Sequence, residues 1–224
     1  MRIAEIFYSV QGEGSLIGVP SVFVRTSGCN LRCVWCDTPY TSWNPEGEEL
    51  TIDEIVTRAM AYPAARYVVL TGGEPMIAPA IVQLSQRFRE RGMHITIETA
   101  GTLFVEVACD LMSISPKLAN STPEGTFQAQ HERLRRQPEV LRKLMAAYDY
   151  QLKFVIATEG DIEEIDALVA ELSAPANKVI LMPEGVRADV LQERGVWIAE
   201  ICKQRGFRFT PRLHVELYGN RRGV

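Results

Sequence analysis

Short apolar runs alternate with longer amphipathic segments along most of this chain. The apolar runs predict strands at residues 3–7, 21–26, 66–70, 94–98, 111–114, 151–156 and 178–182. Segments with helical spacing of their apolar residues predict helices at 51–62, 80–91, 138–147, 162–172 and 188–205. Thr51 and Glu54 have the spacing of a capping box, and Gly92 follows the second helix, so two of these ends are marked by local chemistry.

Strands that alternate with helices indicate a parallel sheet with right-handed crossovers. About six such strands are too few to close an eight-stranded barrel, so we expect an α/β fold with an open, partial (β/α) barrel. With 46% hydrophobic and 23% charged residues, the 224 residues can bury a full core as one domain, residues 1–224. The polar stretch at 118–137 has no clear periodicity and is interpreted as an irregular excursion from this domain.

The unusual loops of the chain all follow predicted strands, at residues 27–40, 71–75, 99–102, 115–117, 158–160 and 183–185. The carboxyl ends of parallel strands meet at one edge of a sheet and carry the active site in folds of this kind. The sequence therefore predicts one site, at the mouth where these six loops converge.

Charge and hydropathy exclude several classes of protein. The 24 Lys and Arg against 28 Asp and Glu give a net charge of −4, and no basic stripe indicates a nucleic-acid partner. No apolar run approaches the ~20 residues that span a bilayer, and no signal-peptide core is visible. We therefore expect a cytoplasmic protein that binds neither nucleic acid nor membrane.

Three of the five cysteines, Cys29, Cys33 and Cys36, form a C-x3-C-x2-C array, whereas Cys109 and Cys202 lie far along the chain. An odd count without a secretion signal argues against disulfides, and clustered thiolates select zinc or an iron–sulfur cluster. Three thiolates on a four-iron cluster would leave one iron open. The alternative is a zinc site completed by one of the three histidines of the chain, His94, His131 and His214.

The C-x3-C-x2-C array resembles the signature of the radical S-adenosylmethionine (SAM) superfamily. Within it, the chain is similar to the 7-carboxy-7-deazaguanine synthase family over residues 9–117. The similarity lies in six further motifs, at residues 9–14, 18–25, 37–38, 71–75, 98–102 and 115–117. Ala100 stands where the family pattern has a polar Asn.

This resemblance implies conversion of 6-carboxy-5,6,7,8-tetrahydropterin to 7-carboxy-7-deazaguanine with loss of ammonia, in queuosine or another deazapurine pathway. It implies a [4Fe-4S] cluster, SAM and Mg2+ as cofactors, a homodimer, and a flavodoxin- or ferredoxin-like electron donor. Cys29, Cys33 and Cys36 would hold the cluster, and Thr38 the Mg2+. The pterin substrate would be bound by Val10, Gln11, Gly12, Arg25 and Thr71. SAM would be bound by Trp35, Cys36, Asp37, Gly73, Glu74, Ser115, Pro116, Lys117 and Lys153. No histidine is expected to act as a general base.

Each of these residues also has an ordinary structural interpretation. Arg25 is assigned to the substrate carboxylate because its guanidinium is a planar fork, and the alternative is an internal ion pair. Thr38 offers the hard oxygen that Mg2+ prefers, or it caps a helix or a turn. Residues 71–75 could be an ordinary strand–helix turn. Trp35 could be a packed aromatic residue, and Lys153 a lysine at the rim of the barrel.

Two other functions stay open. A glycyl-radical-activating enzyme has the same cysteine spacing but acts on a protein. A non-enzymatic module with bound metal would need only the cysteine loop.

Overall fold

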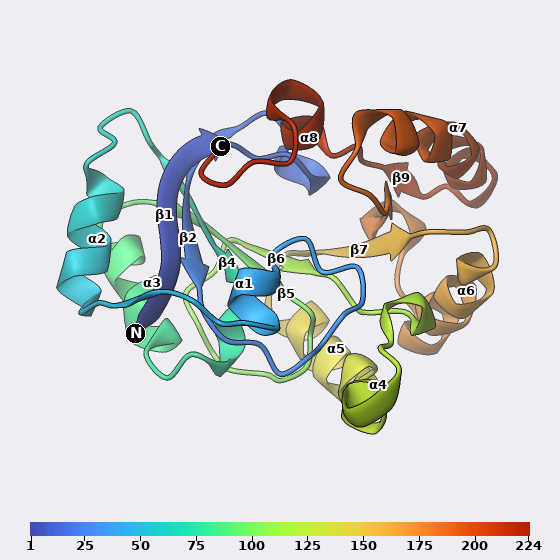
Figure 1. The fold of residues 1–224 in the computed structure, drawn as a ribbon, viewed down its shortest axis with the longest axis horizontal. Helices are drawn as coiled ribbons and strands as arrows, with labels where there is room; N and C mark the ends of the chain where they lie inside the picture. Colours follow the sequence, from blue (N-terminus) through green and yellow to red (C-terminus); the bar gives the residue numbers. More distant parts are fainter.

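One curved sheet of nine strands organises the molecule, whose computed structural model describes residues 1–224 (Figure 1). The strand order is β3-β1-β2-β4-β5-β6-β7-β8-β9. The strands span Arg2–Val10 (β1), Pro20–Thr26 (β2), Glu48–Glu49 (β3), Tyr67–Gly72 (β4), His94–Thr99 (β5), Leu111–Ile114 (β6), Tyr150–Ile156 (β7), Val179–Pro183 (β8) and Arg208–Phe209 (β9). From β2 through β9 all pairs are parallel.

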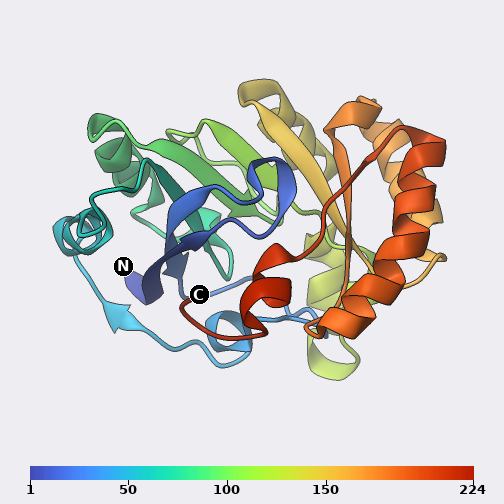
Figure 2. The same cartoon turned by 90° about the horizontal axis from the view of Figure 1, so that it is seen from above.

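Helices cover the outside of this sheet, and the two ends of the sheet do not pair with each other (Figures 1 and 2). The α-helices span Pro39–Ser42 (α1), Ile52–Met60 (α2), Ile81–Glu90 (α3), Gln128–Arg135 (α4), Pro138–Ala147 (α5), Asp161–Leu172 (α6), Ala188–Arg205 (α7) and Leu213–Tyr218 (α8). Thr51 caps α2 in a complete capping box with Glu54, as its sequence predicts. The expected open partial barrel is confirmed.

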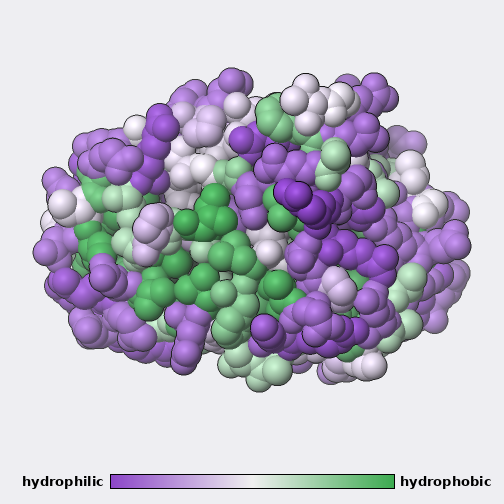
Figure 3. All heavy atoms as spheres, turned by 90° about the horizontal axis from the view of Figure 1, so that it is seen from below, coloured by the Kyte–Doolittle hydropathy of each residue, from purple (hydrophilic) through white to green (hydrophobic).

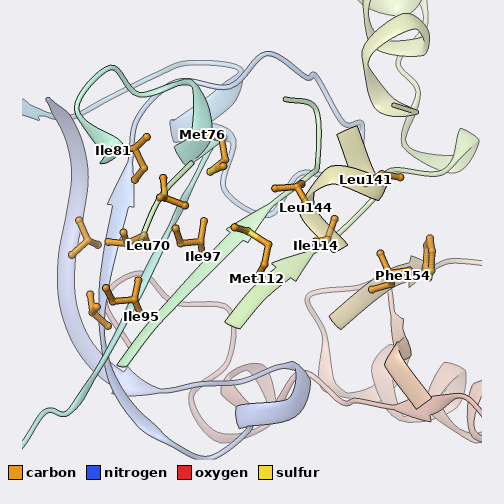
Figure 4. Packing of buried hydrophobic residues seen from close by; sticks show 14 of the residues in the cluster. Leu70, Met76, Ile81, Ile95, Ile97, Met112, Ile114, Leu141, Leu144 and Phe154 are labelled. Carbon is orange, nitrogen blue, oxygen red and sulfur yellow. The ribbon is translucent and has the colours of Figure 1, made fainter. Parts of the chain in front are cut away.

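Alternate residues of the parallel strands project to opposite sides of the sheet. Ile97, Met112 and Phe154, from three neighbouring strands, join the core between sheet and helices, where Leu141 and Leu144 of α5 meet them (Figure 4). The intervening residues point the other way, into the hollow of the barrel. Helix packing thus uses one face of each strand and leaves the other face for a cavity.

Strand β1 differs from the expected parallel arrangement, because it pairs antiparallel with both β2 and β3. The connection between β1 and β2, residues 11–19, is shorter than the dozen or so residues that a parallel crossover requires. Strands β3 and β9 have two residues each, too few to give a sequence pattern.

The stretch at residues 118–137 is not wholly irregular, because it contains helix α4 and two short 3-10 turns. His131 is the only buried residue of α4, so this helix has no apolar stripe that the sequence could reveal.

The C-terminal segment crosses the open side of the barrel. The amide of Leu213 donates to the carbonyl of Gly12, and Thr210 accepts a hydrogen bond from the amide of Gly14. Figure 2 shows this segment, in red, beside the blue N-terminal strands. The opposite face of the molecule carries an apolar area bordered by polar surface (Figure 3). No helix is long and apolar enough to cross a bilayer.

Phe154 tests whether the helix-facing side of the sheet carries the stability of the fold. Its side chain is fully buried, so Phe154→Ala should lower the free energy of unfolding by about 3–5 kcal/mol through lost burial and a cavity. Phe209→Ala removes a ring that is 39% exposed and should cost less than about 1 kcal/mol. Urea titration of both variants measures the two losses, and equal losses would contradict the idea that the fully buried part of the core carries the stability.

Candidate active site

A cavity of about 480 Å³ opens at the carboxyl ends of the parallel strands. Its walls come from the cysteine loop, the ends of the parallel strands, the loop after β1 and the C-terminal segment. Of the residues that the sequence predicts for the site, fifteen line it: Val10, Gln11, Gly12, Arg25, Cys29, Cys33, Trp35, Cys36, Asp37, Thr38, Thr71, Gly73, Ser115, Lys117 and Lys153. Glu74 and Pro116 are buried behind this lining.

The three clustered cysteines open into this cavity and form no disulfide. Burial raises the pKa of Cys29 to about 12 and that of Cys33 to about 11, so these free thiols are protonated at neutral pH. Iron would displace their protons on binding, as metals do at thiolate sites. Cys109 and Cys202 lie outside the cavity, as the sequence predicts for small core residues.

The histidines do not complete a zinc site. Both ring nitrogens of His131 are already hydrogen-bonded, one by the amide of Arg32 and the other to Ser121. His94 is the first residue of β5, so it lies at the amino ends of the parallel strands, opposite the cavity. His214 lines the cavity. No three His, Cys, Asp or Glu side chains surround one point closely enough to hold a single ion. The donor set is three soft thiols without a fourth protein ligand, which fits a cluster with one open iron.

Gly73 and Glu74 brace the base of the cysteine loop. A Cβ on Gly73 would lie 2.0 Å from the carbonyl oxygen of Gly28, so only glycine allows this approach. The Glu74 carboxylate is fully buried and accepts hydrogen bonds from the amides of Met76 and Ala100 and from the Thr99 hydroxyl. Burial raises its pKa, against these hydrogen bonds. The contact at position 100 is made by the main chain and does not need a polar side chain there.

Lys117 offers the cavity a cation without a carboxylate partner. Its ammonium donates to the hydroxyl of Ser115 (2.8 Å) and the carbonyl of the same residue (3.0 Å), and lies 5.7 Å from the centre of the Trp35 ring. The indole of Trp35 is held in turn by the carbonyl of Asn120, 3.0 Å from its Nε1. This corner can receive a ligand carboxylate beside an aromatic face.

Arg212 links three segments that are far apart in the sequence. It donates to Asp37 of the cysteine loop, to Glu13 after β1 (3.2 Å) and to the carbonyl of Gly185 after β8 (2.6 Å). Glu13 also pairs with Lys153. Burial opposes the charge on Glu13, but Lys153 and Arg212 outweigh it and hold the pKa of Glu13 well below its ordinary range. Lys153 therefore lines the cavity as a paired cation.

Arg25 forms an ion pair but keeps donors free. Its Nε donates to Glu5 Oε1 at 2.9 Å, and the same carboxylate accepts a hydrogen bond from the Tyr40 hydroxyl. The terminal nitrogens of Arg25 have no protein partner, although the side chain lies in the cavity wall against the ring of Phe7. The internal-pair interpretation therefore describes one edge of the guanidinium, and the forked end is still available to a carboxylate.

Thr38 precedes α1 in the helix-capping position, but its hydroxyl makes no capping hydrogen bond. It accepts only a long contact, 3.4 Å, from the hydroxyl of Thr41 and lies 3.8 Å from the sulfur of Cys36. The helix-cap interpretation is therefore wrong for the side chain, and a hard oxygen faces the cavity.

Several residues of the cavity were not predicted as site residues from the sequence: Glu5, Glu13, Glu98, Ser113, Arg212 and His214. Glu98 accepts a hydrogen bond from Thr71 at 2.7 Å and Ser113 one from Gln151 at 2.8 Å. Both lie on the cavity side of their strands, so strict alternation along β5 and β6 was a signal that would have found them.

Comparisons with known proteins place this chain in a family. The radical SAM superfamily model matches residues 23–158. A 7-carboxy-7-deazaguanine synthase of Halobacterium salinarum is 44% identical, with 98% of this chain and 91% of that protein covered. One from Rhodopirellula baltica is also 44% identical, with 100% and 89% covered. The crystal structure of QueE from Escherichia coli superposes with a TM-score of 0.69 at 27% identity, covering 95% of this chain and 94% of that one.

The chain belongs to the 7-carboxy-7-deazaguanine synthase family of radical SAM proteins. This confirms the resemblance that the motifs at residues 9–117 indicated. It also confirms the expectation of an enzyme whose cofactors are a four-iron cluster and SAM.

A substitution at Arg212 tests whether its ion pairs, which join the C-terminal segment to the cysteine loop, stabilise the fold. Arg212→Met leaves Asp37 without its cation and should lower the free energy of unfolding by roughly 3 kcal/mol. This is the low end for breaking a buried pair, because Asp37 is partly exposed. Arg187→Met removes an exposed Arg–Asp pair, which water and salt screen, and should leave the free energy of unfolding nearly unchanged. The two losses can be compared by chemical denaturation, and equal losses would rule out a special role for Arg212.

Proposed function

We propose that this chain converts 6-carboxy-5,6,7,8-tetrahydropterin to 7-carboxy-7-deazaguanine and ammonia. One observation carries the proposal: a single cavity joins three thiols without a fourth ligand to two cations, Arg25 and Lys117, that have donors to spare. The substrate and SAM each carry one carboxylate. Each of these two cations has free donors that can receive one such carboxylate.

Cys29, Cys33 and Cys36 hold the cluster in this proposal, and the fourth iron is left for SAM. When bound, the cluster and SAM supply a radical that takes a hydrogen atom from the substrate. Lys117 and Ser115 bind the carboxylate and ribose of SAM, and Trp35 lies along its adenine. The remaining SAM residues predicted from the sequence, which are Cys36, Asp37, Gly73, Glu74, Pro116 and Lys153, shape this half of the cavity or stand behind it.

Glu74 and Lys153 have less freedom than the resemblance implies. Glu74 already accepts three hydrogen bonds and lies behind the cavity lining, which favours a bracing role. Lys153 neutralises Glu13. We propose that Glu74 acts on SAM indirectly, through the loop that it fixes, and that Lys153 compensates the charge of Glu13 at the cavity wall.

Arg25 binds the substrate carboxylate through its two terminal nitrogens, because Glu5 occupies Nε and so fixes the direction of the fork. The loop after β1 contributes Val10, Gln11 and Gly12. The side-chain amide of Gln11 donates to the Ser21 hydroxyl at 3.0 Å. This hydrogen bond fixes Gln11, so that its remaining polar groups and the adjacent main chain face the pterin. Thr71, held by Glu98, completes the substrate half.

A product assay tests the function. Anaerobically reconstituted, reduced protein incubated with SAM and 6-carboxytetrahydropterin should form 7-carboxy-7-deazaguanine, detected by mass spectrometry, with one ammonia per product. Cys33→Ala should form none. SAM cleavage without any deazapurine would favour the glycyl-radical-activating alternative, although residues 220–224 lie in the cavity wall and narrow it for a protein substrate. A colourless protein with one zinc per chain would favour the metal-binding module.

Thr38 is proposed to coordinate Mg2+ beside the substrate. Thr38→Ala removes the hydroxyl and should lower activity and weaken the response to Mg2+ by about tenfold or more, the low end of losses at metal-supporting residues. Thr38→Ser keeps the oxygen and should behave like the wild type. Activity measured across a Mg2+ titration distinguishes them, and unchanged turnover and metal response in Thr38→Ala would refute this role.

Arg25 is tested by the Michaelis constant. Arg25→Met should raise the KM for the carboxylated pterin by roughly 10- to 100-fold, the range for losing a charged hydrogen-bonding pair. Arg25→Lys keeps the charge without the fork and should give an intermediate value. If Arg25→Met is merely less stable, with an unchanged KM, the residue serves only the internal pair with Glu5.

The homodimer, the flavodoxin- or ferredoxin-like electron donor and the cytoplasmic location stay predictions. They rest on the resemblance and the composition. Sedimentation of the purified protein measures the first, and reduction of the cluster by each class of carrier measures the second.

A further inference from the structure

The stretch at residues 118–137 has no place in the chemistry proposed above, yet it holds the cysteine loop at several points. The amide of Val34, between the second and third clustered cysteines, donates to the carbonyl of Ser121 at 3.0 Å. The amide of Arg32, between the first and second, donates to His131 Nδ1 at 3.1 Å. Each gap between the cysteines is thus tied to this stretch by one main-chain amide.

His131 is the centre of these contacts. It is 1% exposed and is the only buried residue of α4. Its Nδ1 accepts from a main-chain N–H, so that nitrogen carries no proton. Nε2 therefore bears the hydrogen and donates it to Ser121, 2.9 Å away, whose own hydroxyl donates to the carbonyl of Leu118 at 2.6 Å. The ring is neutral in this arrangement, and burial lowers its pKa in the same direction.

We propose that His131 is a positioning residue for the cluster: its unprotonated Nδ1 holds the Arg32 amide and thereby orients the loop that carries the three cysteines. The inference rests on the proposed assignment of Cys29, Cys33 and Cys36 as iron ligands. An apolar residue would anchor a helix equally well, but only a side chain with an acceptor on one edge and a donor on the other satisfies both Arg32 and Ser121.

This arrangement has a consequence for the cluster itself. Hydrogen bonds to the sulfurs of an iron–sulfur cluster help to set its reduction potential. An amide that donates to His131 cannot donate to a cluster sulfur. Once its acceptor is lost, the Arg32 amide is free to turn towards the cluster, where it would stabilise the reduced, more negative state and shift the potential upward.

Two substitutions at His131 distinguish the contact made by Nδ1 from the contact made by Nε2. In His131→Asn the amide oxygen takes the place of Nδ1 and keeps an acceptor for Arg32. In His131→Gln the amide nitrogen takes the place of Nε2 and keeps the donor to Ser121, while the Arg32 amide loses its partner. His94→Gln is the matched control, because His94 is the first residue of β5 and lies away from the cysteine loop.

The measurements are made on iron-loaded holoenzyme: the reduction potential, the EPR spectrum of the reduced cluster, and the rate at which a chelator removes iron. We expect His131→Gln to raise the potential, alter the spectrum and lose iron roughly 3- to 10-fold faster, the range for one lost hydrogen bond. His131→Asn and His94→Gln should match the wild type. Identical behaviour of His131→Gln and wild type in all three would overturn the inference.

Hydrogen exchange of the wild-type holoenzyme tests the same contact without a variant, in case His131→Gln does not fold. The Arg32 amide should exchange at least about tenfold more slowly than the freely exposed amides of the loop, and an unprotected amide would overturn the inference. If wild-type protein holds no cluster, the proposed function is wrong and the inference falls with it. A normal wild-type cluster with unaltered variants overturns the role of His131 alone.

Discussion

The alternation of side chains along the parallel strands is the constraint on which this structure depends. Neighbouring residues of a strand face opposite sides, so the same segment that buries Ile97 against helices must send Glu98 into the hollow of the barrel. Burial of the apolar face stabilises the sheet, and this fixes the direction of the polar face as well. The cavity and the core are therefore two sides of one pattern.

Charges buried in such a cavity must be compensated, and the chain does this with residues that are distant in sequence. Glu13 faces Lys153 and Arg212, and Arg212 also faces Asp37, which is 175 residues away. Removing any one member would leave an unpaired charge near the cavity, which is more costly than the pair is stabilising. The network thus couples the C-terminal segment to the cysteine loop and gives that segment a structural reason to cross the open side of the barrel.

Local signals in the sequence were sufficient for the parallel strands and their helices, and the family motifs added fifteen of the residues that line the cavity. Such signals lie within a few residues of one another. Examples are the capping box at Thr51, the cysteine spacing and the polar loops after the strands. The role of α4 could not be predicted, because one buried histidine leaves no periodicity. The partners of Arg25 and Lys153 could not be predicted, because Glu5 and Glu13 lie on other segments. Pairing of β1 with β2 brings Glu5 to Arg25, and the curvature of the sheet brings the loop with Glu13 to Lys153 of β7.

The cysteine loop explains why so many distant segments converge here. Residues 27–38 form neither helix nor strand, so their amides and carbonyls must find partners elsewhere. Gly73 and Glu74 meet the loop at its base, Ser121 and His131 accept its amides, and Trp43 donates to the carbonyl of Cys33 at 2.9 Å. Bonds that satisfy the backbone also hold the thiols close to one cavity before iron arrives. Preorganisation of this kind reduces the ordering cost of binding. Because the loop contains only three cysteines, it offers the cluster three ligands and leaves the fourth position open.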